Sequence, residues 1–114
     1  MIKVVCKSKL NEEYQLNYSS KTVFECLKES LPKTKIVRAY PRIVEINDAD
    51  MVIDCMTPGY KTKITVVAVS DDKSTVKFFL KSASPGQVID LWNRNKKNVK
   101  AILEQLTADL ESNN

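Results

Sequence analysis

The carboxylates between residues 48 and 54 are the most enzyme-like feature of the sequence. Asp48, Asp50 and Asp54 carry the oxygen ligands that Mg²⁺ and Ca²⁺ prefer. A calcium loop of the EF-hand type needs oxygens at fixed alternating positions and a distal Glu, and this segment lacks that pattern. Turn preference explains Asp48 and Asp50, and the exposed face of a strand explains Asp54. We therefore predict no metal site and no cofactor.

The cysteines do not form a recognisable reactive or metal-binding motif. Cys6, Cys26 and Cys55 lie far apart in apolar contexts, and the chain has no histidine. Zinc needs closely spaced Cys or His ligands, and a catalytic nucleophile usually needs a base within reach. The two glycines, Gly59 and Gly86, are too few for a glycine-rich phosphate loop. The sequence predicts buried thiols in a reducing compartment and a protein that is not an enzyme.

A basic cluster near the end of the chain suggests a different kind of partner. It consists of Arg94, Lys96, Lys97 and Lys100, in a chain of net charge +4. Combined with the sheet lysines Lys61, Lys63, Lys77 and Lys81, it would form a surface for nucleic acid or an acidic protein. Few aromatic residues accompany these lysines, although single-strand binders normally stack bases on aromatic rings. A solvated helix face is favoured, and nucleic-acid binding is the alternative.

Aromatic and sulfur-containing side chains predict an apolar pocket beneath a closing helix. The candidate lining residues are Trp92, Phe78, Phe24, Tyr40, Met51 and Met56, with Asn95 or Arg38 as polar anchors. Small-molecule sites are mostly apolar with a few polar groups. A chain of 114 residues also needs such side chains for its core, so ordinary core packing is the alternative.

Length and composition predict one domain. The 114 residues are 43% hydrophobic and 28% charged, which suits a single core. We expect one α+β domain over residues 1–111 and a disordered tail at 112–114. No apolar run has the length of a signal peptide or a membrane span, so we expect a soluble, cytoplasmic protein without a membrane partner.

The first part of the chain predicts a strand, or a hairpin, followed by a helix. Residues 2–8 and 14–18 alternate, with a turn expected at residues 11–13, so they form a hairpin or one long strand bent at Asn11. Ser19 and Ser20 are typical N-cap residues, and Thr22 with Glu25 is a capping-box alternative one turn later. Apolar residues at helical spacing follow until Pro32, which predicts a helix of about three turns.

Four strand signals come next, each bounded by turn residues. They cover Lys35–Ile46, Met51–Thr57, Thr62–Val69 and Thr75–Ser82. Pro41 makes the first an edge strand or a bulged one. The third is apolar on both faces, which predicts a central strand.

The last third, Ser84–Leu110, predicts the helix that closes the sheet. Val88, Trp92, Asn95, Val99, Ile102, Leu106 and Leu110 form one stripe at helical spacing. A continuous helix from Gln87 would put Asn95 on the apolar face, so a helix capped near Asn93 is favoured. The order strand, helix, four strands, helix predicts a two-layer α+β fold with a twisted antiparallel sheet of five to six strands.

This order resembles the helix-grip domains of the START and Bet v 1 kind and the TATA-binding-protein-like architecture. The residues that carry the resemblance are 76–82, 87–92 and 95–99, which are similar to small bacterial proteins where a last strand turns into an Asn- and Lys-rich helix. The resemblance implies a capacity to hold an apolar ligand between sheet and helix, and it implies no reaction.

Three functional hypotheses follow. The leading one is an apolar small molecule bound between the sheet and the last helix, with Trp92 near the mouth. The second is the basic surface described above. The third is a homodimer that pairs through a strand edge or through the apolar face of Val67, Val69 and Phe79. The protein is accordingly expected to be a monomer or a homodimer.

Overall fold

The computed structural model describes residues 3–7, 11–35, 40–57, 60–82 and 91–112, and side-chain environments within 11–35, 40–56, 61–79 and 97–112. Its elements, in chain order, are β1 (Lys3–Lys7), β2 (Asn11–Leu16), α1 (Ser20–Ser30), a 3₁₀ turn (Leu31–Lys33), β3 (Arg42–Asn47), β4 (Val52–Thr57), β5 (Tyr60–Ser70), β6 (Lys73–Ser82) and α2 (Leu91–Ser112).

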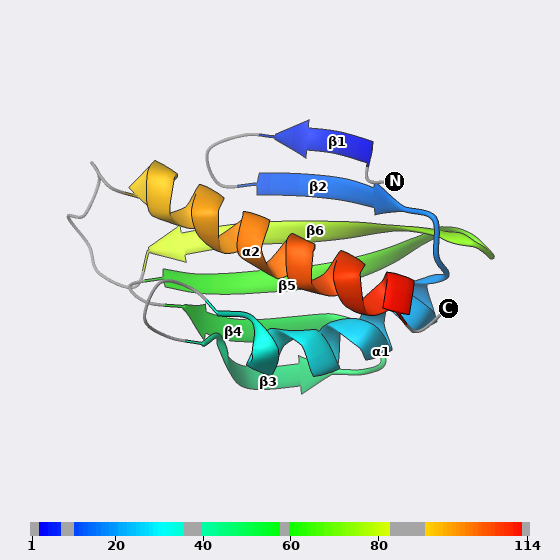
Figure 1. Ribbon diagram of the computed structural model, residues 1–114, viewed down its shortest axis with the longest axis horizontal. Coiled ribbons are helices and arrows are strands. Elements are labelled where there is room, and N and C mark those ends of the chain that lie inside the picture. The colour runs from blue at the N-terminus through cyan, green and yellow to red at the C-terminus, as the bar shows by residue number, and fades with distance from the viewer. Residues whose placement is uncertain (1–2, 8–10, 36–39, 58–59, 83–90, 113–114) are drawn as a thin grey trace.

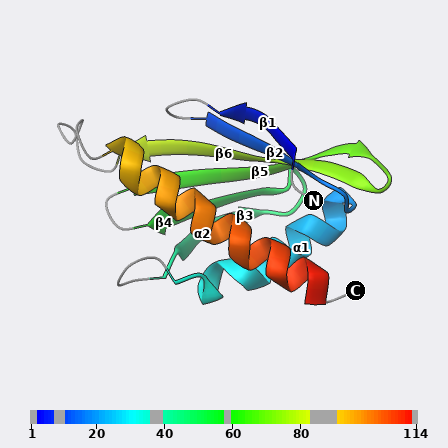
Figure 2. The same ribbon diagram turned by 45° about the horizontal axis from the view of Figure 1, so that its top comes forward.

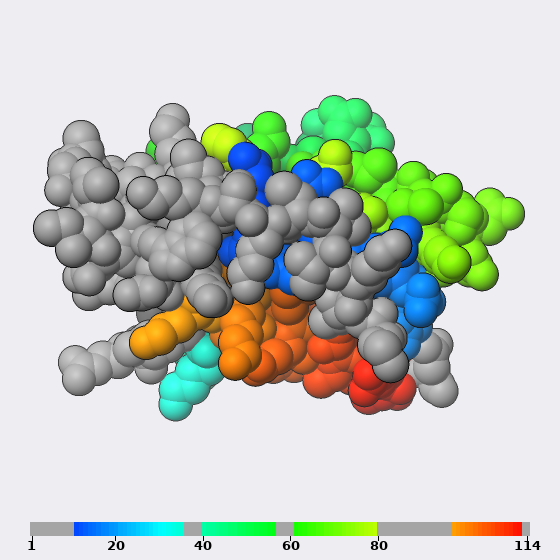
Figure 3. Space-filling view, turned by 90° about the horizontal axis from the view of Figure 1, so that it is seen from above, coloured from blue at the N-terminus to red at the C-terminus, as the bar shows by residue number. Residues whose placement is uncertain are grey.

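The strands form one six-stranded antiparallel sheet in the order β1-β2-β6-β5-β4-β3. Both helices lie on the same face, with α2 crossing the sheet diagonally and α1 beside its C-terminal half (Figures 1 and 2). Seen from above, the green strands lie on one side and the orange and red α2 on the other (Figure 3). We call the helix-covered side the inner face and the opposite side the outer face. The predicted two-layer α+β fold is confirmed.

The N-terminal residues form the hairpin alternative rather than one bent strand. The turn expected at residues 11–13 is wrong, because all three residues belong to β2. They pair in register with β6, Glu12 opposite Phe78 and Glu13 opposite Lys77. This pairing continues the alternation of Tyr14 and Leu16 back to Glu12, so Glu12 faces inward.

Helix α1 begins and ends close to where the capping residues predict. The Ser19 hydroxyl accepts a hydrogen bond from the Thr22 backbone N–H at 3.2 Å, as an N-cap side chain does. The helix ends at Ser30, and Pro32 lies in the 3₁₀ turn that follows. Its inward side carries Val23, Phe24, Cys26 and Leu27, all buried.

Strands β3 and β4 are shorter than predicted. The expected strand over Lys35–Ile46 is wrong at Lys35, Tyr40 and Pro41, which belong to no strand, and residues 36–39 lie outside the described ranges. Strand β3 is the predicted edge strand. The β-bulge lies between Ile43 and Glu45 instead of at the proline. Strand β4 begins at Val52 because Met51 has a φ of 55°, in the left-handed region that strands do not use.

Strand β5 is central, as predicted, and α2 differs from prediction at both ends. Helix α2 begins at Leu91, two residues before the expected cap at Asn93, and includes Ser112, the first residue of the expected tail. The proposed start at Gln87 and the residues Asn113 and Asn114 lie outside the described ranges. The predicted stripe is present, since the side chains of Val99, Ile102, Leu106 and Leu110 are buried.

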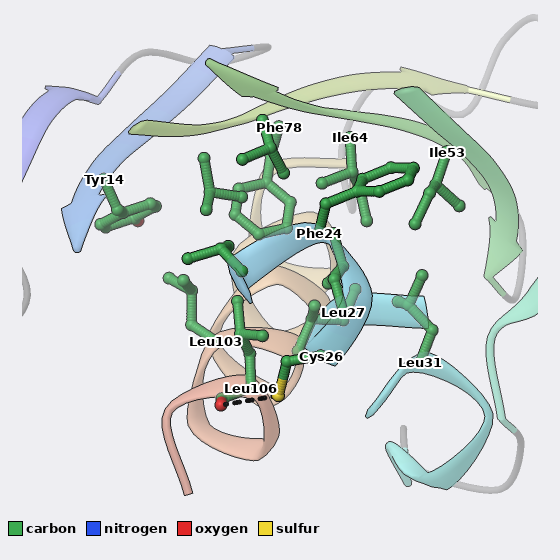
Figure 4. Packing of buried hydrophobic residues seen from close by; sticks show 14 of the residues in the cluster. Tyr14, Phe24, Cys26, Leu27, Leu31, Ile53, Ile64, Phe78, Leu103 and Leu106 are labelled. Carbon is green, nitrogen blue, oxygen red and sulfur yellow. Dashed lines mark hydrogen bonds between the residues drawn. The ribbon is translucent and has the colours of Figure 1, made fainter. Parts of the chain in front are cut away.

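The core fills the space between the inner face and the second half of α2. Leu27 and Leu31 from the α1 segment, Ile53 and Ile64 from the sheet, and Leu106 from α2 meet there (Figure 4). All five are fully buried. Each such side chain stabilises the fold by about 1.5–3 kcal/mol through burial.

A polar joint connects the C-terminal ends of α1 and α2. The Asp109 carboxylate accepts hydrogen bonds from the Ser30 hydroxyl at 2.6 Å and from the Gln105 amide at 3.0 Å, and Lys33 Nζ lies 3.1 Å away. These partners, the Ser30 hydrogen bond first, hold the pKa of Asp109 below its usual value. They also offset the cost of a carboxylate at the negative end of a helix dipole.

Removing a central core side chain should destabilise the domain strongly. We expect Leu106→Ala to lower the free energy of unfolding by about 2–5 kcal/mol, because it leaves a cavity at a fully buried position. Val69→Ala is the control, since Val69 is exposed and should change stability by less than about 0.5 kcal/mol. Urea denaturation followed by circular dichroism measures both. Equal effects would contradict this packing.

The contacts of the Asp109 carboxylate should make the free energy of unfolding depend on pH. Because the folded pKa lies below the unfolded one, the contribution is complete above the unfolded value near 4 and is lost as pH falls through the folded value. Asp109→Asn should therefore lower the free energy of unfolding at pH 7, and the difference from wild type should shrink as pH falls below about 4. Urea denaturation at a series of pH values tests this. A difference independent of pH would refute the ionic role of Asp109.

Candidate functional site

Phe78 is the centre of the inner face near the first half of α2. It lies on β6, directly opposite Glu12 on β2 and Ile64 on β5. Phe24 from α1 lies close to Phe78 and Ile64 in the same layer (Figure 4). Phe78 is only 1% exposed. An aromatic ring at this position separates the two polar groups described next.

A buried carboxylate lies on one side of Phe78. Glu12 is only 4% exposed, and the Tyr14 hydroxyl donates a short hydrogen bond to its Oε1 atom. The Tyr14 ring meets the Phe78 ring edge-on, with centroids 6.1 Å apart and an interplanar angle of 75°. Burial, then the hydrogen bond to Glu12, then the charge of Glu12 raise the pKa of Tyr14 well above its usual value. Tyr14 is therefore held as a neutral hydrogen-bond donor.

A buried hydroxyl lies on the other side of Phe78. Ile64 on β5 is opposite Phe78, so Thr62, two residues before Ile64, is the diagonal neighbour of Phe78. Thr62 is buried, and its Oγ1 atom has no hydrogen-bond partner in the described part of the chain. Native proteins leave few such atoms unpaired, so each one calls for an explanation. We call Glu12, Tyr14 and Thr62 the inner polar group.

Helix α2 adds a buried polar residue to this face. Asn98 is as buried as Glu12 and is adjacent in sequence to Val99, the first core residue of the described stripe. The amide can both donate and accept hydrogen bonds. Its position is one helical turn after Asn95, the anchor that the sequence predicted. The inner polar group and Asn98 therefore place an acidic acceptor, two hydroxyls and an amide within a layer that also contains the buried Ser74, whose Oγ atom likewise has no described partner.

The described thiols are poor nucleophiles. Burial, with a smaller effect from Asp54, raises the pKa of Cys55 to about 12. Burial also raises the pKa of Cys26, whose thiol donates to the Leu106 carbonyl at 4.0 Å (Figure 4). Reactive cysteines have lowered pKa values instead. Packing is thus the evident role of both side chains.

The predicted pocket residues do not all gather at one place. Phe24 and Phe78 lie together in the core, as described above. Tyr40 is 58% exposed, and Met56 alternates with the buried Cys55 and so faces outward, so neither lines the space under α2. Met51 packs at the edge of the core. The side chains of Trp92 and Asn95, in the first turns of α2, and residue Arg38 lie outside the described set.

The two basic sets lie on opposite faces of the molecule. Lys97 and Lys100 are exposed on α2, over the inner face. Lys61, Lys63 and Lys77 are exposed on the outer face, because they alternate with the inward residues Thr62, Ile64, Val76 and Phe78. The predicted combined surface is wrong, since the sheet separates its two halves. The side chains of Arg94, Lys96 and Lys81 lie outside the described set.

The acidic residues around the β3–β4 turn have local partners. Asp48 forms an ion pair with Lys28 of α1, with 2.9 Å between its Oδ1 atom and Lys28 Nζ. The Asn47 side-chain amide donates a hydrogen bond to the Asp50 carboxylate, and the Asp50 backbone N–H donates one to Asn47 Oδ1. Asp54 faces outward on β4. Asp50 therefore stabilises the turn, and Asp48 connects the turn to α1.

Glu12 is the functional candidate that the sequence analysis missed. Asn11, Glu12 and Glu13 have the composition of a turn, so the sequence analysis did not assign them to a strand. The alternation of Tyr14 and Leu16, extended back by two residues, would have placed Glu12 on the inner face of the strand. A carboxylate at an inward position contradicts the apolar pattern, and such contradictions occur at functional sites.

Comparison with known proteins identifies the fold. No protein-family model and no curated protein matches the sequence. Among solved structures, a START superfamily protein from Mycobacterium smegmatis has a TM-score of 0.62 at 10% identity, covering 92% of this chain and 98% of its own. Ara h 8.0201 has a TM-score of 0.62 at 14% identity, covering 98% and 99%. The chain therefore has the helix-grip fold of START and Bet v 1-like proteins, as the sequence resemblance predicted.

A third similar structure is larger. The di-domain aromatase/cyclase BexL of the BE-7585A biosynthetic pathway has a TM-score of 0.65 at 13% identity. The match covers 92% of this chain and 47% of BexL, so this chain spans about half the length of that protein. Within the described ranges, no helix is both long and apolar enough to cross a membrane.

The Glu12–Tyr14 contact should be visible in the titration of Tyr14. We expect Tyr14 to ionise above the usual range for tyrosine, and Glu12→Gln to lower its pKa without restoring the usual value, because burial remains. Ring-labelled tyrosine NMR resolves the four tyrosines. Glu13→Gln is the control, since Glu13 lies on the outer face. An unchanged Tyr14 pKa in Glu12→Gln would refute the contact.

Proposed function

We propose that this protein binds a small, largely apolar molecule between the inner face of the sheet and the first half of α2. The observation that carries the proposal is the inner polar group around Phe78, above all the buried Thr62 hydroxyl without a described partner. A plain core has no use for an unpaired hydroxyl and a buried carboxylate in one layer. Ligand sites combine apolar walls with a few such groups.

The chemistry of the inner polar group defines the ligand. Glu12 accepts hydrogen bonds, and Thr62 donates or accepts one. The matching molecule has an apolar body, held against Phe78, and a hydroxyl or amine that donates to Glu12. The similarity in fold to an aromatase/cyclase and to a START superfamily protein supports a binding role of this kind.

We propose binding rather than turnover, and a cytoplasmic location. The two described thiols have raised pKa values, which argues against a thiolate mechanism. They are also unpaired and buried, as thiols in a reducing compartment often are. A basic surface for nucleic acid is the weaker alternative, because its lysines are divided between two faces.

The ligand class can be tested with a matched pair of probes. We expect 2-naphthol, which has a donor hydroxyl, to bind more tightly than naphthalene, measured by ligand-observed NMR. Glu12→Gln should weaken 2-naphthol binding roughly tenfold or more, because hydrogen bonds to charged groups contribute about 1.5–3 kcal/mol. Binding of naphthalene should not change. Glu13→Gln should bind both probes as wild type does.

A second variant separates ligand binding from folding. Thr62→Val replaces the unpaired hydroxyl by a methyl group of similar size. It should raise the free energy of unfolding of the ligand-free protein by about 1 kcal/mol and weaken 2-naphthol binding. If Thr62→Val destabilises the protein and leaves binding unchanged, the hydroxyl serves the fold alone and the proposal fails. Native mass spectrometry of the purified protein provides an independent check for a retained ligand.

A further inference from the structure

A buried thiol lies directly across the strands from the Thr62 hydroxyl. Cys55 on β4 pairs with Thr62 on β5 in the register of the sheet, so both side chains lie on the inner face. Each of the two residues is only 2% exposed. Residues opposite each other in an antiparallel pair have Cβ atoms about 4.5–5.5 Å apart. The thiol and the hydroxyl are therefore close neighbours, one row along the sheet from Phe78.

Both groups have a proton to donate and no described acceptor for it. Thr62 Oγ1 has no hydrogen-bond partner in the described part of the chain. Cys55 is a free thiol without a hydrogen bond inside the described ranges, whereas the Cys26 thiol contacts Ser30 and the Leu106 carbonyl. Burial raises the pKa of Cys55 to about 12, so Cys55 keeps its S–H proton at neutral pH. An O–H and an S–H donor thus lie side by side.

The other unpaired hydroxyl, that of Ser74, has different surroundings. Ser74 pairs with Leu16 on β2 and with Ala68 on β5, so its neighbours across the strands are apolar. It is the second residue of β6 and lies beside the β5–β6 turn. Cys55 and Thr62 lie near the end of β4 and the start of β5, at the end of the molecule where α2 begins (Figure 1). Only Thr62 therefore combines a polar neighbour with a place beside the first half of α2.

The distance to Glu12 sets the size of a molecule that contacts both groups. Glu12 is opposite Phe78, Phe78 is opposite Ile64, and Thr62 is two residues from Ile64. With strands about 4.8 Å apart and a rise of about 3.3 Å per residue, Glu12 and Thr62 are roughly 12 Å apart along the sheet. With hydrogen bonds of about 2.8 Å at each end, the two polar atoms of the molecule are at least roughly 6 Å apart. Substituents at opposite ends of a fused two-ring system have such a separation.

We propose that Cys55 and Thr62 form a second subsite, which binds a carbonyl oxygen of the ligand. This inference rests on the proposed function, because it concerns the same ligand. A carbonyl oxygen has two lone pairs, so it accepts from the O–H and the S–H together. A ligand donor with one proton would leave both of these protons unpaired. The ligand is therefore an apolar molecule with a hydrogen-bond donor at the Glu12 end and a carbonyl group at the Thr62 end.

A second matched pair of probes tests the subsite. 6-Acetyl-2-naphthol adds a ketone to 2-naphthol at the end opposite the hydroxyl. We expect it to bind about threefold to tenfold more tightly than 2-naphthol in ligand-observed NMR titrations, because a net hydrogen bond between neutral groups contributes this much. Thr62→Val should abolish the gain, and Thr62→Ser should keep it. Thr65→Val is the matched control and should keep the gain, since Thr65 lies on the outer face of the same strand.

The carbonyl carbon reports the contact directly. With the ketone of 6-acetyl-2-naphthol labelled with ¹³C, the resonance of the bound probe should lie further upfield in Thr62→Val than in wild type, because the carbonyl loses a hydrogen bond. Cys55→Ala should cause a smaller upfield shift, since S–H is a weak donor. Glu12→Gln should weaken binding and leave the resonance at saturation unchanged. Urea denaturation shows whether each variant is folded.

The possible results separate this inference from the proposed function. Equal affinities for the two naphthols in wild type, or a gain that persists in Thr62→Val, would overturn the carbonyl subsite. The proposed function would still stand if 2-naphthol bound more tightly than naphthalene in a manner that depends on Glu12. If neither naphthol binds, both proposals fail. A carbonyl resonance that is the same in wild type and Cys55→Ala would remove Cys55 from the subsite.

Discussion

The fold depends on one interaction, the packing of the apolar stripe of α2 against the inner face of the sheet. A six-stranded sheet with Ile53, Ile64, Val76 and Phe78 on one side would expose a large apolar surface without a cover. Helix α2 covers this surface diagonally, and α1 fills the space beside its second half (Figure 1). The buried stripe residues from Val99 to Leu110 explain why the helix lies in this orientation.

The polar contacts fix the helices where burial alone would leave them free to shift. Hydrophobic burial is non-directional, so it does not specify a single packing angle. The Ser30–Asp109 hydrogen bond aligns the ends of α1 and α2, and Lys28 connects α1 to the β3–β4 turn while it lies 5.0 Å from the Phe24 ring centroid. Such joints contribute modest energy but define which arrangement forms.

Much of the fold could be predicted from periodicity, whereas the site could be predicted only in part, through Phe24 and Phe78. Alternation and helical spacing identified the central strand β5, the edge position of β3, the Ser19 cap and the α2 stripe. Met51 was misassigned because a left-handed φ at a methionine has no sequence signal. Glu12 was missed because its type suggested a turn, while its partner in the sheet, Phe78, lies 66 residues further along the chain. Pairings of that range follow from the three-dimensional register and not from local pattern.

The same register explains why the two faces of the sheet carry different side chains. Consecutive strand residues point to opposite sides, so Glu12 and Phe78 face the helices while Glu13 and Phe79 face outward. A buried carboxylate and an unpaired hydroxyl reduce stability on the inner face, and an exposed phenylalanine does so on the outer face through contact with water. The helix-grip fold does not require either loss of stability, because apolar residues on the inner face and polar residues on the outer face would form the same fold. We propose that these departures from the simple pattern serve binding and not folding.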